Sequence, residues 1–209
     1  SDQDDSGPWI RKTFPGIFYI CSPGYTYGDA TWLGFSFGMP GSNKDVVSND
    51  WIAKNIQEGH GPLGVAYPDV AYGMEGDSPS FMFLIDNGLN NPEHPEYGGW
   101  GGRYMYYLPS PSTKPGLVVR PNWPVTLPET RPLWTNAEDS VYSPVDKLWH
   151  KSAQATIWRW RKEYQNDFAA RMEWVTKDYK DANHPPVARL GCADHFTVKS
   201  GEQFHLSAK

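Results

Sequence analysis

The chain has 209 residues, enough for one large domain with a sizeable core, and its 10 Trp, 12 Tyr and 9 Phe exclude a disordered protein. Acidic residues outnumber basic ones 24 to 19, and the net charge of -5, without a visible cluster of Lys or Arg, argues against a nucleic-acid-binding protein. No apolar run approaches the ~18 residues that a membrane-spanning helix needs.

The opening sequence SDQDDSG is acidic and lacks an initial Met, so we expect the chain to continue from an earlier part of a longer protein. Asp2, Asp4 and Asp5 are candidate sugar-binding residues, because carboxylates accept hydrogen bonds from sugar hydroxyls. In an extended segment Asp2 and Asp4 project to the same side. The alternative is a solvated chain end, or an N-cap for the segment that follows, and spacing alone leaves both open.

Three elements are expected between residues 14 and 57. Residues 14–22 form a β-branched and aromatic run bounded by Pro and Gly, which predicts a strand buried on both faces, as in a parallel sheet. Residues 23–45 are rich in Gly and turn formers, which indicates a long surface loop. Residues 46–57 have a helical pattern, with Ser48 as the expected N-cap.

A glycine-rich stretch at residues 59–64 and the acidic residues Glu75 and Asp77 form a second candidate site. Glycines let a backbone approach a ligand closely, and the two carboxylates precede an apolar run at residues 81–85 that is expected to open a helix. Free N–H groups at a helix start favour polar ligands. The alternative is a capped helix after a tight turn, and His60 is expected to be an ordinary loop histidine.

Residues 90–139 are dominated by Pro, Gly, Trp and Tyr without a sustained period, which is typical of a functional or mobile stretch. Within it, four glycines flank Trp100, and an exposed indole there would offer a flat platform for a sugar ring or a base. Arg103 could form paired hydrogen bonds with a ligand oxygen. In the alternative, Trp100 plugs the edge of the core and Arg103 holds an internal acid such as Glu75 or Asp77.

One amphipathic helix is expected toward the end of the chain, because apolar residues there recur at intervals of three and four. These residues are Ile157, Trp160, Tyr164, Phe168, Met172 and Val175. Asn166 and Asp167 interrupt a helix face otherwise covered by Arg, Lys and Glu, and Asp167 borders the buried face. Asp167 is therefore a candidate ligand for Ca²⁺, which prefers oxygen atoms, or else the partner of Arg171 in an i,i+4 salt bridge.

The last segment is expected to belong to another domain. The sequence DANHPP at residues 181–186 ends the helical pattern, and residues 196–206 predict two strands around a Ser-Gly turn. Two strands cannot form a sandwich alone, so this tail is expected to begin a second, β-rich domain. Cys21 and Cys192 are expected to be free thiols.

Five strings of the sequence, taken in order, resemble the cellulose-binding protein family that carries a nucleoside-hydrolase-like domain. The strings are SDQDDSGPWIRKTFP, NIQEGHGPLG, MEGDSPSFMFLIDNGL, PEYGGWGGRY, and RWRKEYQNDFAARMEW followed by ANHPPV. The resemblance implies that residues 1–186 are the C-terminal half of that α/β domain and that residues 187–209 begin an immunoglobulin-like β-sandwich. The implied fold is an open, mostly parallel sheet flanked by helices, with its ligand at the carboxyl ends of the strands.

The resemblance also implies roles for particular residues. Asp2 and Asp4 are similar in position to a segment with which nucleoside hydrolases grip ribose hydroxyls. Asn166 and Asp167 resemble a His-Asp pair in which the Asp binds calcium and the His assists the leaving base. Asn166 cannot donate a proton as a general acid, so the usual route of N-glycoside cleavage is in question. We expect this chain alone to be inactive, since the main calcium ligands of the family precede it.

The expected function is a carbohydrate-binding or carbohydrate-processing module of a secreted, periplasmic or cell-surface polysaccharide-utilisation protein. Its sugar-binding residues would be Asp2, Asp4, Asp5, Glu75, Asp77, Trp100, Arg103 and Asn166, with Asp167 on calcium. One alternative is a calcium-dependent hydrolase of nucleoside-type glycosidic bonds that needs the N-terminal half of the domain as a partner. Another is a purely structural piece paired with that half, and oligomers are compatible with each of these functions.

Overall fold

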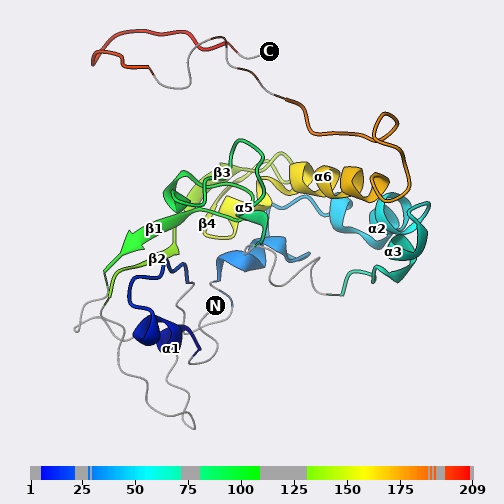
Figure 1. Cartoon of the computed structure of the whole chain (residues 1–209), viewed down its shortest axis with the longest axis horizontal. Helices are drawn as coiled ribbons and strands as arrows, with labels where there is room; N and C mark the ends of the chain where they lie inside the picture. Colours follow the sequence, from blue (N-terminus) through cyan, green and yellow to red (C-terminus); the bar gives the residue numbers. More distant parts are fainter. Residues whose placement is uncertain are drawn as a thin grey trace.

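The structure is a computed structural model of the chain, and it describes residues 6–21, 28, 30–71, 81–108, 131–187, 189, 191 and 196–207. In these residues the backbone forms short helices and two small sheets, joined by long irregular segments (Figure 1). The candidate residues Asp2, Asp4, Asp5, Glu75 and Asp77 lie outside the described part of the chain. No described helix combines the length and apolar character that crossing a bilayer requires.

Most helices have fewer than nine residues, and the longest is α6. In chain order the helices are α1 (Ser6–Thr13), η2 (Thr31–Phe35), η3 (Asp45–Val47), α2 (Asn49–Ile52), the π-helical η4 (Ala53–Gln57), α3 (Gly61–Ala66), η5 (Pro95–Tyr97), α5 (Ala155–Trp158) and α6 (Arg161–Glu173). In Figure 1, α6 runs beside α2 and α3, and α5, which precedes it, contacts the β3–β4 sheet.

Both sheets are antiparallel pairs. Strand β1 (Tyr104–Tyr107) pairs with β2 (Leu133–Asn136), and β3 (Asp139–Tyr142) pairs with β4 (Trp149–Ser152). The link between β2 and β3 is only Ala137 and Glu138, so the two sheets follow one another closely along the chain.

The expected open, mostly parallel sheet is wrong for the described residues. Their one parallel pairing is an isolated bridge between Ile20 and Trp134. Residues 14–22 do not form the predicted buried strand, because Pro15 and Gly16 close a turn in which the amide of Ile17 donates to the carbonyl of Phe14. Phe14, Ile17 and Phe18 of this run are exposed, and the run has a single bridge within the described chain.

The core lies along α5 and α6 in three clusters. Ile157 and Tyr164 pack with Phe35 and Met82, while Met172 packs with the α2 and η4 residues Ile52 and Ile56. The third cluster joins α5 to β3 through Ala155, Trp158 and Val141. The predicted helix is confirmed over Arg161–Glu173, where Tyr164 and Met172 contribute to two separate clusters. Ile157 lies in the separate helix α5, and Val175 is exposed.

Two further sequence predictions have different outcomes. The N-cap at Ser48 is confirmed, since its hydroxyl accepts a hydrogen bond of 3.2 Å from the amide of Trp51. In the tail, the Ser200-Gly201 turn is confirmed, and Gly201 has a φ of +86° there. The two flanking strands are wrong, because residues 196–207 contain no strand, and the expected start of a β-sandwich is not formed there.

Candidate functional site

An open hollow of about 730 Å³ lies where the two small sheets meet. Its walls come from segments that are distant in the sequence, including the ends of β1, β2 and β4 and the turn that leads into α5. The lining residues are Gly28, Arg103, Met105, Asn136, Ala137, Glu138, Lys151, Ser152, Ala153 and Gln154. Six of these ten side chains carry hydrogen-bonding groups, although apolar atoms form the larger part of the wall; the hollow is called the polar hollow for these six side chains.

Arg103 is fixed at the edge of the hollow by several contacts. Its Nε lies 2.7 Å from Oδ1 of Asp139, and its Nη2 donates to the carbonyl of Glu138 at 2.7 Å. The other carboxylate oxygen of Asp139, Oδ2, lies 3.3 Å from Nη1 of Arg159. Because Asp139 is the first residue of β3, these bonds tie the segment before β1 to the second sheet.

Two side-chain amides form further parts of the wall. The Nε2 atom of Gln154 donates to the carbonyls of Gly28 at 3.0 Å and Ala30 at 3.2 Å. Asn136 accepts a hydrogen bond of 2.8 Å from the hydroxyl of buried Thr31. These bonds keep both amides in place before any ligand arrives, which lowers the entropy that binding must overcome.

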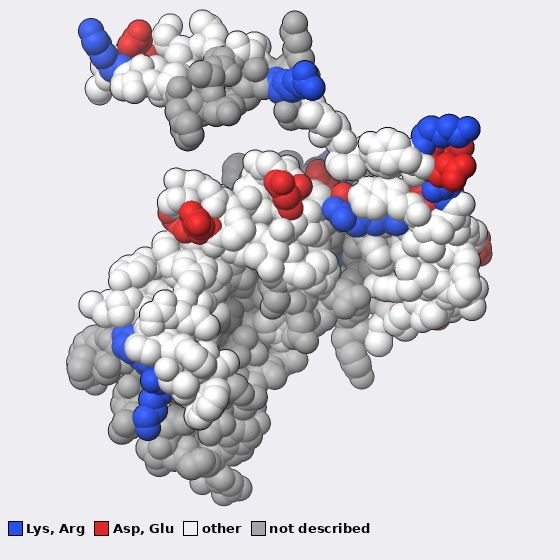
Figure 2. Space-filling model, in the orientation of Figure 1, with Lys and Arg blue, Asp and Glu red and all other residues white. Residues whose placement is uncertain are grey.

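The hollow presents donors and acceptors with little net charge. Arg103 is neutralised by Asp139, and the exposed ammonium of Lys151 lies 3.8 Å from the carboxylate of Glu138. Mixed donors and acceptors of this kind suit a ligand rich in hydroxyl groups. On the face shown in Figure 2, Lys and Arg side chains lie in separate groups and form no continuous basic patch.

Trp100 and Arg103, both singled out from the sequence, lie in different surroundings: Trp100 packs on the core and Arg103 lines the polar hollow. Trp100 is half-buried and packs against the core cluster of Phe35 and Tyr164, and its amide donates to Oδ1 of Asn90 at 2.9 Å. This is the core-edge arrangement that was one of the two alternatives. Arg103 does hold an internal acid, Asp139, whereas Glu75 and Asp77 lie outside the described part of the chain.

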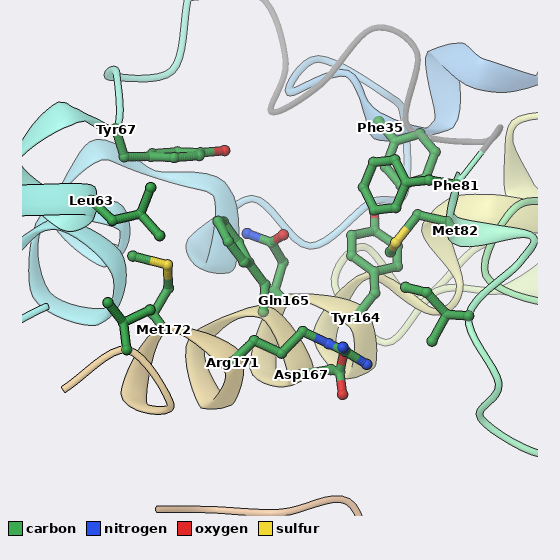
Figure 3. A pocket seen from close by; sticks show the side chains of 13 residues that line it. Phe35, Leu63, Tyr67, Phe81, Met82, Tyr164, Gln165, Asp167, Arg171 and Met172 are labelled. Atoms are coloured by element: carbon green, nitrogen blue, oxygen red, sulfur yellow. The ribbon is translucent and has the colours of Figure 1, made fainter. Parts of the chain in front are cut away.

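A second cavity, of about 360 Å³, lies along α6 and has mainly apolar walls. Figure 3 shows Leu63 and Tyr67 on one side, Phe81 and Met82 on the other, and α6 along the base. Tyr164 also lines this cavity, and its burial raises the pKa of its hydroxyl to about 12. The hydroxyl therefore stays protonated at physiological pH.

Asp167 lies at this second cavity, whereas Asn166 is exposed and is not among its lining residues. The Oδ2 atom of Asp167 accepts a hydrogen bond of 2.6 Å from Nε of Arg171, the i,i+4 partner expected from the sequence. Figure 3 shows the two side chains next to each other. The structure thus places the adjacent residues Asn166 and Asp167 in different surroundings.

The described residues around Asp167 do not fit a calcium site. Calcium takes about six to eight oxygen ligands, whereas this carboxylate is engaged by a guanidinium. In the segments that the structure describes, no three His, Cys, Asp or Glu side chains gather in a group that could hold a metal ion. We therefore derive no catalytic step through a metal.

The polar hollow contains five polar side chains that sequence reasoning did not single out: Asn136, Glu138, Lys151, Ser152 and Gln154. They carry no motif, and they come from two stretches of the chain, residues 136–138 and 151–154. The closest signal is the group of turn formers Ser143, Pro144 and Asp146 between two short runs, which indicates a hairpin but does not reveal what the hairpin faces.

Residues 1–104 match the model of the family described as cellulose-binding Sde182, nucleoside hydrolase-like domain. The match extends from the acidic opening to the first residue of β1, so it includes Trp100 and Arg103 but not α6. Comparisons with curated proteins and with solved structures gave no match. Through its first 104 residues the chain belongs to the cellulose-binding Sde182 family, nucleoside hydrolase-like domain.

Proposed function

We propose that this chain is a carbohydrate-binding module and that its sugar site is the polar hollow between the two sheets. The observation that carries the proposal is the set of side chains around the hollow, where Arg103, Glu138, Lys151 and Gln154 bring donors and acceptors together. The family description as cellulose-binding supports the same ligand class. This site replaces the pocket expected at the carboxyl ends of a parallel sheet.

Neutral sugars suit the hollow better than acidic ones. A pyranose offers hydroxyl groups that both donate and accept, and it brings no charge that needs a partner. Arg103 is already paired with Asp139, which Arg159 also contacts, and Lys151 lies 3.8 Å from Glu138. A uronic acid would have to compete with Glu138 or Asp139 for these cations. We therefore assign the module to neutral polysaccharides such as cellulose, within a secreted polysaccharide-utilisation protein.

Isothermal titration of the full chain with cellohexaose and with a hexamer of galacturonic acid tests the proposal. We expect saturable binding of cellohexaose and little binding of the acidic hexamer. The double variant Glu138→Ala, Lys151→Ala should weaken cellohexaose binding about tenfold, which corresponds to roughly 1.4 kcal/mol of lost hydrogen bonding. Both side chains are exposed, so the fold should be unaffected.

Lys199→Ala is a matched control, because Lys199 is an exposed lysine in the tail that does not line the hollow. Its affinity for cellohexaose should equal that of the unaltered chain. Absence of binding to any neutral oligosaccharide by the unaltered chain would overturn the proposed function. Equal affinity of the double variant would show that the sugar binds elsewhere.

A further inference from the structure

Two large aromatic side chains lie exposed on the β3–β4 hairpin. Trp149 is 69% exposed and Tyr142 is 48% exposed. The two residues are a cross-strand pair, and their ring centroids lie 5.7 Å apart at an interplanar angle of 61°. The two rings together present a continuous apolar area to solvent on one face of the hairpin.

The register of the hairpin explains why both rings face solvent. Side chains alternate between the two faces of a strand. Val141 faces inward and packs with Ala155 and Trp158 of α5, and its partner His150 lies against Trp158 with ring centroids 5.9 Å apart. Tyr142 is the neighbour of Val141 on β3, and Trp149 is the neighbour of His150 on β4. Both must therefore face outward.

The same outer face leads into the polar hollow. Lys151 lies two residues after Trp149 on β4, pairs with Ser140 across the hairpin, and lines the hollow. At about 3.3 Å per residue, roughly 7 Å of strand separates Trp149 from Lys151. A chain of several sugar units can therefore contact the aromatic pair and the hollow at once.

We propose that Trp149 and Tyr142 form a stacking subsite for a neutral polysaccharide, continuous with the hollow and occupied by sugar units next to those bound there. The inference rests on the proposed function, and it adds that the module recognises a ligand of several sugar units. A flat ring offers its face to the C–H groups of a pyranose, while the polar neighbours Ser140 and Lys151 meet its hydroxyl groups. These polar flanks favour a hydroxyl-rich occupant over an apolar protein surface.

Affinities for cellobiose and cellohexaose, measured on the full chain, test this subsite. We expect cellohexaose to bind more tightly than cellobiose. Trp149→Ala should reduce cellohexaose affinity about tenfold, the effect of losing one stacking contact of roughly 1.4 kcal/mol, and should leave cellobiose affinity unchanged. Trp149→Phe keeps a flat ring and should retain most of the affinity, whereas Trp149→Leu keeps apolar volume without the ring and should behave like Trp149→Ala.

Tyr179→Ala is the matched control, because Tyr179 is an exposed aromatic residue on the segment after α6 and does not line the hollow. Thermal unfolding of each variant checks that the hairpin remains folded. Equal cellohexaose affinity in Trp149→Ala and the unaltered chain would overturn the stacking subsite while leaving the proposed function intact. Full retention of affinity in Trp149→Leu would replace ring stacking with a general apolar contact and overturn it as well.

Discussion

Arg103 and Asp139 form an ion pair in which Nε of the guanidinium lies 2.7 Å from Oδ1 of the carboxylate. The pair joins the segment that precedes β1 to the first residue of β3, and Arg103 lines the polar hollow. Both side chains are partly shielded from water, which makes the pair stronger than an ion pair on the open surface.

Replacing Asp139 by Asn should lower the free energy of unfolding by about 1–2 kcal/mol, because Arg103 and Arg159 then lose their charged acceptor. Urea unfolding followed by tryptophan fluorescence measures the change. Glu138→Gln is the matched control, because the Glu138–Lys151 pair is exposed and its charged atoms lie 3.8 Å apart. This variant should lower the free energy of unfolding by less than about 0.5 kcal/mol. Equal losses in the two variants would contradict a special role for the Arg103–Asp139 pair.

Arg161 should be the charged residue that contributes most to stability. It is 1% exposed, and its Nη2 donates to the carbonyls of Gly34 at 2.6 Å and Ser36 at 2.8 Å. Its Nη1 donates to the hydroxyl of Ser42 at 2.8 Å. Arg161→Met leaves these acceptors without donors, so we expect a loss of about 2–4 kcal/mol in the free energy of unfolding.

The neighbouring Arg159 provides the comparison for this prediction. Arg159 is exposed, contacts Asp139 at 3.3 Å and lies over the ring of Trp160. Arg159→Met should lower the free energy of unfolding by less than about 1 kcal/mol. If both variants unfolded at the same urea concentration, the bonds of Arg161 to the η2 region would not be what stabilises this part of the core.

Local signals in the sequence were enough for some elements. Ser48 ahead of a helical pattern predicts a cap because its hydroxyl reaches an amide three residues later, and the cap forms. The periodic apolar positions of α6 likewise depend only on helix geometry, and Tyr164 and Met172 are buried as that geometry requires. Neither prediction required knowing which other segment of the chain packs against the helix.

The sheet and the hollow could not be predicted in the same way. Residues 14–22 have the composition of a strand, but composition does not identify a partner, and only Ile20 forms a bridge, to Trp134. The hollow depends on Arg103 meeting Asp139, which are separated by 36 residues. The glycine-rich surroundings of Trp100 left open whether its ring is exposed or plugs the edge of the core, and the structure shows the second arrangement, with its amide bonded to Asn90.

Acidic pH should weaken the turn between β3 and β4 through Asp146. Burial alone would raise the pKa of Asp146, but hydrogen bonds from the amide of Leu148 and from His150 outweigh it and hold the pKa below its ordinary value. A lowered folded-state pKa means that this contribution to stability is present above the unfolded value, about 3.9, and is lost as the pH falls through the folded-state value.

Urea midpoints at pH 7 and pH 3 measure this effect. The unaltered chain should lose more stability between the two values than Asp146→Asn, which lacks the titrating group. Asp181→Asn serves as the comparison, because Asp181 is an exposed aspartate on the segment after α6, and it should show the same pH dependence as the unaltered chain. An identical pH dependence in Asp146→Asn would contradict the prediction.

Asp167 should act as a partner of Arg171 and not as a calcium ligand in this chain. Asp167→Asn should lower the free energy of unfolding by about 0.5–1 kcal/mol, the range of an i,i+4 pair that is partly shielded. Calcium chloride should leave the unfolding temperature of the unaltered chain equal to that in magnesium chloride. Calorimetry in both salts measures this.

The chain should also release no product from nucleosides or nitrophenyl glycosides, with or without calcium. Asn166 has no proton to give a leaving group, and the carboxylate next to it is held by Arg171 at 2.6 Å. Asn166→His would restore an ionisable side chain at that position, yet it should remain inactive because Asn166 faces solvent and does not line the cavity of Asp167. A calcium-dependent rise in unfolding temperature that Asp167→Asn abolishes would instead make Asp167 a metal ligand, and turnover by the unaltered chain would make it an enzyme.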